Sequence, residues 1–113
     1  MVAAFQGSLG TLRRTGERAR KLANDTTDKA ETLVTKGYPK EMAQHFHAQI
    51  KPMYDAAQKG LDAWSTYGKM DLAGKSEPEI EELRGQVDEH TAYVEKVIAA
   101  SEHMRKEVSR IIK

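Results

Sequence analysis

One stretch decides the fold of this chain, residues 77–112, which read EPEIEELRGQVDEHTAYVEKVIAASEHMRKEVSRII. Mostly apolar residues recur here at alternating spacings of three and four, which is typical of the a and d seam of a coiled coil. The seam consists of Ile80, Leu83, Val87, His90, Val94, Val97, Ser101, Met104, Val108 and Ile111. The stretch never alternates with a period of two, so the pattern predicts a long helix and no strand.

The same spacing occurs in two earlier segments of the chain. The first seam consists of Phe5, Leu9, Leu12, Gly16, Ala19, Ala23, Thr26, Ala30 and Leu33, and the second of Ala43, Phe46, Ile50, Met53, Ala57, Gly60, Trp64 and Tyr67. Small residues fill the middle of the first seam, and they face Ala57 and Gly60 when the chain folds back. We therefore expect the first two helices to approach each other closely there.

Turn signals separate the three segments. Gly37 suits the end of one helix and Pro39 the first turn of the next. The second connection is rich in glycine, and Ser76 with Glu79 forms a capping-box pattern after it. These signals predict helices over about residues 3–36, 39–67 and 77–112.

The length of 113 residues fits one domain, residues 1–113. Segments of 30 to 36 residues give helices of roughly 45–54 Å, and short connections make neighbouring helices antiparallel. The expected fold is therefore all-α, an elongated up-down-up three-helix bundle with coiled-coil-like heptad seams. Trp64 is expected in its core, and Pro52 is expected to kink the second helix without breaking it.

The composition excludes several classes of protein. The chain has no Cys, which excludes disulfide scaffolds, Cys-ligated zinc and a thiol nucleophile. No run of apolar residues is long enough for a transmembrane helix, and no secretory signal is expected. Phosphate-binding glycine loops, nucleophile elbows and His-Glu-x-x-His motifs are also missing from the sequence. We expect a protein that is not an enzyme and that needs no cofactor.

Four histidines are the first candidates for chemistry. His45 and His47 lie on different faces of a helix, although folding brings them near the level of His103. A metal cluster across two helices is geometrically possible, but the spacing fits no standard pattern, and surface histidines with no metal are the favoured interpretation. His90 falls on the third seam, where we favour a partly exposed ring over a buried pH-sensitive one.

The net charge of +1 conceals an uneven distribution. A basic cluster lies on the outer faces of the first helix and consists of Arg13, Arg14, Arg18, Arg20 and Lys21, whereas residues 77–95 are strongly acidic. Because the first and third helices should be parallel neighbours, we expect ion pairs between them. Three roles remain open for the cluster: a solvated face, a site for an acidic protein or anionic lipid, and a phosphate contact with nucleic acid.

Residues 1–23 are rich in Arg and poor in acids, as mitochondrial targeting segments are. The expected location is therefore intracellular, either cytoplasmic or, if this segment is an uncleaved address, mitochondrial.

The favoured function is that of a non-enzymatic structural or interaction protein, a small subunit or adaptor that docks to a protein partner or to itself. Apolar residues beside the seams support this reading, because they widen the apolar stripe beyond one line. They are Tyr54, Leu61, Tyr93, Ile98 and Ile112. One alternative is a surface-active protein whose amphipathic helices bind lipid or membrane surfaces. Another is a nucleic-acid accessory factor that uses the basic first helix.

Overall fold

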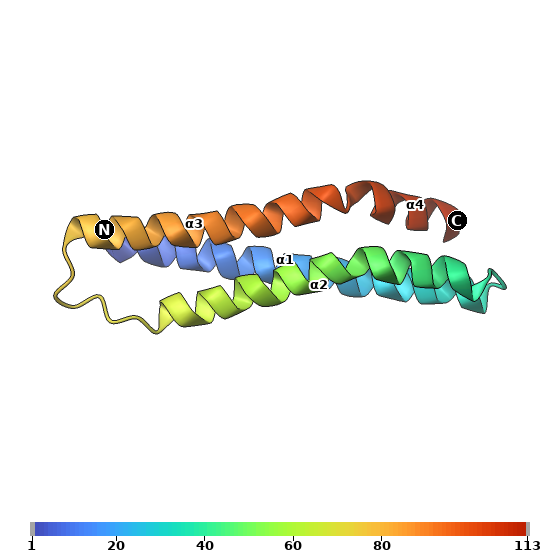
Figure 1. Cartoon of the computed structure of the whole chain (residues 1–113), viewed down its shortest axis with the longest axis horizontal. Coiled ribbons are helices and arrows are strands. Elements are labelled where there is room, and N and C mark those ends of the chain that lie inside the picture. The colour runs from blue at the N-terminus through green and yellow to red at the C-terminus, as the bar shows by residue number, and fades with distance from the viewer. Residues whose placement is uncertain (1, 113) are drawn as a thin grey trace.

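The computed structural model describes residues 2–112, and 88% of them are helical with no strand among them. The helices are α1 (Val2–Thr35), α2 (Lys40–Gly68), α3 (Glu77–Ala100) and α4 (Glu102–Ile112). They form a rod whose principal extents are 61 × 20 × 17 Å (Figure 1). The predicted all-α, elongated bundle is therefore confirmed.

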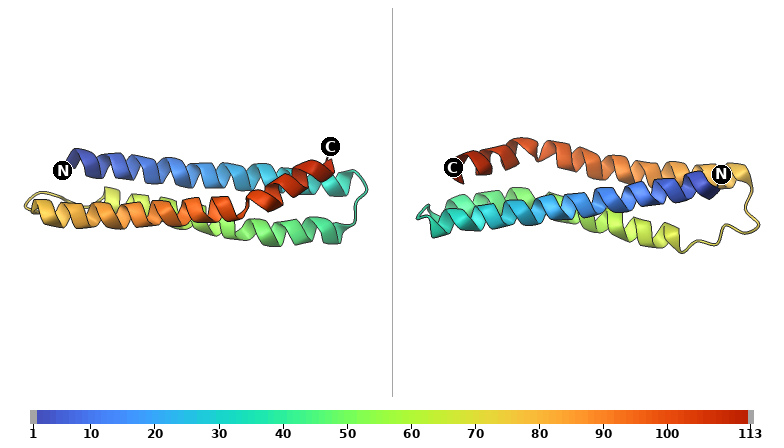
Figure 2. Two further views of the ribbon diagram at one scale, coloured as in Figure 1. Left: turned by 90° about the horizontal axis from the view of Figure 1, so that it is seen from above. Right: turned by 180° about the vertical axis from the view of Figure 1, so that it is seen from behind.

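The path of the chain is up, down and up again. α2 returns antiparallel to α1, and α3 then runs back beside both of them (Figure 1). α4 prolongs α3 but swings across toward α1, as the left view of Figure 2 shows. Of all the helix pairs, α1 and α2 share the most extensive contact, while α3 contacts α1 more extensively than it contacts α2.

The turn signals act as predicted. Gly37 and Gly74 have φ angles of 94° and 80°, in the left-handed region where glycine is favoured. Ser76 caps α3, because its Oγ accepts a hydrogen bond from the backbone N–H of Glu79 at 3.4 Å. The Ser76 hydroxyl also donates to the Glu79 carboxylate at 3.1 Å. Ser76 is thus the N-cap as predicted, while Glu79 bonds to its side chain and not to its backbone N–H as in a capping box.

The first seam is buried at every predicted position from Phe5 to Leu33. Its small residues bring α1 and α2 together where Gly16 meets Gly60. A Cβ added to Gly60 would lie 3.9 Å from the Gly16 Cα and only 2.9 Å from Cγ2 of Val94 on α3. All three helices therefore meet at this point, and any larger side chain at residue 60 would push them apart.

The third seam departs from the prediction, because α3 is rotated toward α1. Ile98 and Thr91, which lie one position beyond the predicted seam, are buried. Leu83, His90 and Val97, which belong to that seam, are only half-buried. The side of α3 that faces α2 is thus less well covered than the side that faces α1.

Trp64 does not lie in the core, so that prediction was wrong. The indole is 36% exposed, whereas its neighbour Ala63 is 9% exposed and packs in the core. The reason is the close approach at Gly60, one turn earlier, which leaves room for a methyl group but not for an indole. Trp64 lies instead beside α1, with the Arg13 guanidinium 5.9 Å from its ring centroid.

The third helix is also interrupted, which the heptad pattern did not predict. At the joint between α3 and α4, the Ser101 hydroxyl donates to the Ile98 carbonyl at 2.7 Å. Arg105 donates to that carbonyl at 3.2 Å and to the Ser101 Oγ at 2.9 Å. These side chains satisfy the Ile98 carbonyl in the last turn of α3, so the backbone can change direction there. α2, in contrast, continues through Pro52 without a break.

Candidate interaction surfaces

The basic cluster on α1 consists of Arg13, Arg14, Arg18, Arg20 and Lys21, and all five residues are exposed, as predicted. Their contacts are with uncharged groups. Besides the position of Arg13 over Trp64, Arg14 donates to the Thr11 hydroxyl at 3.2 Å and Arg20 donates to the Gln58 amide oxygen at 2.9 Å. The cluster is therefore turned partly toward α2 and partly toward solvent.

The expected ion pairs between α1 and α3 do not form, so that prediction was wrong. Six ion pairs occur within residues 2–112, and each joins residues of the same helix. Leu22 of α1 packs against the cluster of Ala19, Ala57, Val94 and Ile98, so the contact that α1 makes with α3 there is apolar. Arg13 and Arg20 lie on the opposite flank, where they contact α2.

The acidic start of α3 is partly compensated from within the helix. Arg84 pairs with Glu81 one turn before it and with Asp88 one turn after it, the second contact being 3.3 Å. The hydrogen bond from Arg84 lowers the pKa of Glu81 below its ordinary value. The neighbouring carboxylates Glu82 and Glu89 are exposed, so the outer face of α3 stays acidic.

The five apolar flanking residues do not gather on one surface. Ile98 is 6% exposed and belongs to the core, and Leu61 fills the space beside Gly16. The Tyr54 hydroxyl donates to Asn24 on α1 at 2.6 Å, and Ile112 packs against the core near the turn between α1 and α2. Only Tyr93 is exposed, at 42%, with the Lys59 ammonium 5.8 Å from its ring centroid.

In place of one apolar surface, a groove lies between α2 and α3. It results from the rotation of α3 toward α1, which leaves the other side of α3 partly uncovered. It contains two hollows. One of about 500 Å³ is lined by Lys59, Asp62, Ala63, Thr66, Tyr67, His90 and Tyr93. The other, of about 440 Å³, is lined by Ala48, Gln49, Pro52, Met53, Val97, Ala100, Ser101 and Met104. In the sequence, this groove is indicated by the adjacent apolar residues Val97 and Ile98, because only one of these two side chains can face α1.

A second groove lies between α1 and the end of α2, next to the basic cluster. This hollow of about 410 Å³ is lined by Gln6, Leu9, Gly10, Arg13, Trp64, Ser65, Gly68 and Lys69. Two glycines keep it open, and the indole of Trp64 forms one wall. The sequence pattern gave no sign of this groove, since it placed Trp64 inside the core.

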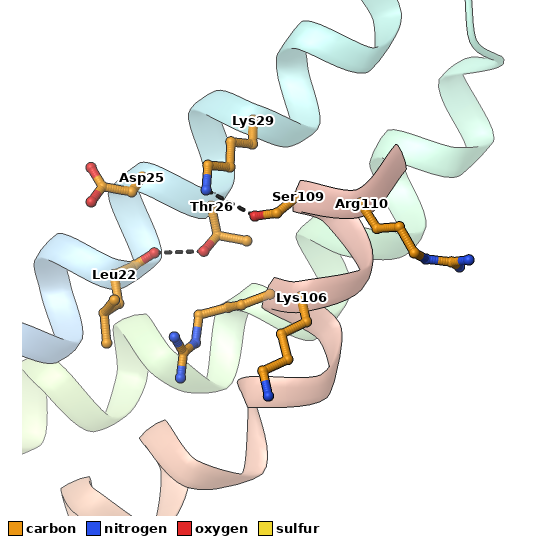
Figure 3. A pocket seen from close by; sticks show the side chains of 8 residues that line it. Leu22, Asp25, Thr26, Lys29, Lys106, Ser109 and Arg110 are labelled. Atoms are coloured by element: carbon orange, nitrogen blue, oxygen red, sulfur yellow. Dashed lines mark hydrogen bonds between the residues drawn. The ribbon is translucent and has the colours of Figure 1, made fainter. Parts of the chain in front are cut away.

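A further hollow, of about 390 Å³, separates α1 from α4 and is shown in Figure 3. The Lys29 ammonium crosses it and donates to the Ser109 hydroxyl at 2.9 Å, and Lys106 pairs with Glu102 at 3.0 Å. Arg110 points away from the hollow (Figure 3) and pairs with Glu107. These cations already have partners within the chain, so the hollow holds α4 on α1 and offers little to a ligand.

The histidines do not form a metal site in the part of the chain that the structure describes. No group of three or more His, Asp or Glu side chains is placed there to hold an ion. His103 lies 3.6 Å from Glu107 on its own helix, and its side chain is fully open to solvent. His90 is half-buried, as predicted, with its ring centroid 5.8 Å from that of Tyr67.

None of the helices within residues 2–112 is both long and apolar enough to span a bilayer. The chain matches no protein-family model, and comparisons with curated proteins and with solved structures find no significant similarity. The functional argument therefore depends on geometry and charge alone.

Proposed function

We propose that this chain is a non-enzymatic interaction protein whose groove between α2 and α3 receives an amphipathic helix of a protein partner or of a second copy. The observation that carries the proposal is the rotation of α3. It buries Ile98 against α1 and leaves Leu83, His90 and Val97 half-exposed toward α2. Two hollows that combine apolar side chains such as Val97 and Tyr93 with polar ones such as Asp62 are thereby left without a covering helix.

The shape of the groove suits a fourth helix. α2 and α3 are antiparallel neighbours, and in four-helix bundles a further helix packs into the groove between such a pair. Small side chains at Ala48, Pro52 and Ala100 line this groove and would let a backbone approach closely. Tyr93 and Lys59 stand at its rim, and aromatic side chains are enriched in protein interfaces.

The proposal that the protein is not an enzyme is supported by the form of its hollows. Each of them lies open along the seam between two helices. Catalytic sites are instead concave and bring a nucleophile, a base and an orienting group together.

A pair of matched variants tests the groove. Ala100→Arg places a long charged side chain in it, whereas Ala92→Arg places the same side chain on exposed backbone of the same helix. We expect the first variant alone to lose association, measured as molar mass by light scattering and as the set of proteins that co-purify with the chain. A strictly monomeric wild-type chain that captures the same proteins as Ala100→Arg contradicts the proposal.

A further inference from the structure

We propose that the face formed by the basic cluster of α1 and by Trp64 of α2 binds anionic phospholipid surfaces. This face is separate from the groove between α2 and α3, so the inference does not depend on the proposed docking function.

The first step of the argument is the charge of the face. The five cations of the cluster are exposed, and none of the ion pairs within residues 2–112 involves them. Glu17 is the one acid in the stretch from Arg13 to Lys21. Because the cations are not neutralised by the protein itself, their full charge is available to an anionic surface.

The second step is the separation of this charge from the acidic helix. No ion pair within residues 2–112 joins an acid of α3 to the cluster, and Leu22 makes the nearby contact of α1 with α3 apolar. Arg13 and Arg20 lie on the other flank, against α2. The cluster therefore forms a basic face on α1, and an anionic surface would orient the rod with this face toward the lipid.

The third step is the position of Trp64. Its half-exposed indole forms the wall of a groove that also contains Leu9, with Arg13 and Lys69 beside it. An indole flanked by cations is the arrangement found at membrane interfaces, where the ring lies at the level of the headgroups. Val2 and Met70 are 48% and 38% exposed. Both lie at the same end of the rod, because α1 begins and α2 ends there (Figure 1).

The same contacts favour lipid over nucleic acid. Single-stranded nucleic acids bind by stacking bases on open aromatic faces. Here the Arg13 guanidinium already lies over the Trp64 ring, and no other aromatic residue occurs among the cations of the cluster. The Trp64 indole can still insert its edge between lipid headgroups while the Arg13 guanidinium lies over the face of its ring.

The test uses the full chain with phosphatidylcholine vesicles that contain or lack phosphatidylserine. Binding is measured by flotation at low salt and by the fluorescence of Trp64, which is the single Trp of the chain. We expect binding and a blue shift of the emission with the anionic vesicles only, and both should decrease as salt is added.

Two triple variants with the same change in net charge separate the cluster from the overall charge. The first is Arg14→Gln, Arg18→Gln and Lys21→Gln, and the matched control is Lys51→Gln, Lys96→Gln and Lys106→Gln. All six side chains are exposed, so both variants should fold, which circular dichroism checks. The cluster variant should bind about fivefold more weakly for each cation removed, and the control should bind nearly as well as the wild type.

Three results would overturn the proposal: no flotation with anionic vesicles at low salt, equal loss in both triple variants, or retention of a nucleic-acid duplex without any binding to vesicles.

Discussion

The side of α3 that faces α1 is well packed, whereas the side that faces α2 is only partly covered. Toward α1, Ile98 packs in a cluster with Ala19 and Leu22 and is almost completely buried. Toward α2, the adjacent Val97 is half-buried and lines a hollow beside Pro52. Two neighbouring residues of similar size and polarity thus have different environments, which shows that α3 packs mainly on α1 and only partly closes on α2.

The difference has a simple physical origin in what each partner helix presents. On its flank toward α3, α1 offers the large apolar side chain of Leu22, whereas α2 offers the bare backbone of Gly60 between Met53 and Tyr67. Burial of Ile98 against α1 removes its apolar surface from water, which stabilises the fold by roughly 25 cal/mol for each Å² buried. A thin bundle with few large residues cannot close all three interfaces equally.

The largest effect is expected from Ile98→Ala, which tests the closed interface. Truncation of a buried Ile leaves a cavity and should lower the free energy of unfolding by about 2–4 kcal/mol. Val97→Ala is the matched control and should lower it by less than about 1 kcal/mol, because Val97 is already half-exposed. Urea unfolding followed by circular dichroism measures both, and equal losses would show that α3 is not rotated toward α1.

A smaller destabilisation is expected from a substitution at Gly60, where the three helices meet. Gly60→Ala adds a Cβ that lies 2.9 Å from the buried, β-branched and therefore stiff Val94. The strain should outweigh the gain in helix propensity and lower the free energy of unfolding by about 1–2 kcal/mol.

Gly85→Ala is the control for that substitution. A Cβ there has no atom within 4 Å, so the same change should stabilise the protein by up to about 1 kcal/mol. Thermal unfolding of both variants should therefore move the midpoint in opposite directions. A stabilising Gly60→Ala would mean that the helices are farther apart than the structure shows.

The joint between α3 and α4 should contribute about 1 kcal/mol through Arg105. Arg105→Ala removes the donor to the Ile98 carbonyl and to the Ser101 hydroxyl. Arg110→Ala removes an exposed partner of Glu107 on the same helix and should have little effect. Hydrogen exchange should show faster opening of residues 102–112 in the first variant only, and equal exchange in both would remove the role assigned to Arg105.

The smallest effect concerns pH and the outer face of α3, which belongs to neither interface. Because Arg84 lowers the pKa of Glu81 in the folded chain, this carboxylate stabilises the fold above its unfolded pKa. The contribution is lost as the pH falls through the lowered folded pKa. Glu81→Gln should therefore flatten the acid side of a plot of melting temperature against pH slightly, and Glu82→Gln is the matched control. A variant as acid-sensitive as the wild type contradicts the prediction.

Much of the fold could be predicted from sequence because the seam of α1 is unambiguous. All nine of its positions from Phe5 to Leu33 are buried, and most of their neighbours in the sequence are polar or small. In α3, however, Val97 and Ile98 are both apolar, and the heptad rule alone cannot decide which one faces the core. The choice depends on what α1 and α2 present, which only the assembled bundle defines.

The places of Trp64 and Ser101 were unpredictable for related reasons. Trp64 continues the period of its seam, but the contact between Gly16 and Gly60 sets a helix separation too small for an indole. The break at Ser101 depends on Arg105, one turn further on, reaching back to a carbonyl. Neither effect is visible in a pattern of single residues, because each needs two or three side chains placed in space.

The candidate interaction surfaces, like the fold, could be predicted from the sequence only in part. The exposure of the basic cluster followed directly from the heptad positions of its residues. Its lack of carboxylate partners could not be predicted in this way, because two adjacent helices need not bring their charged side chains into contact. The angular positions of Arg13 and Arg20, about 100° per residue around the helix axis, point them instead toward α2.

Because the chain runs along the rod an odd number of times, the molecule could hold two attached groups far apart. α1 begins near one end of the rod and α4 finishes near the other (Figure 1), so the two ends of the fold lie far apart along it. A hairpin or a four-helix bundle would return its ends to the same side. Dyes or domains attached to the two ends of this chain would be held apart at a fixed spacing, and they could be read as a molecular distance standard.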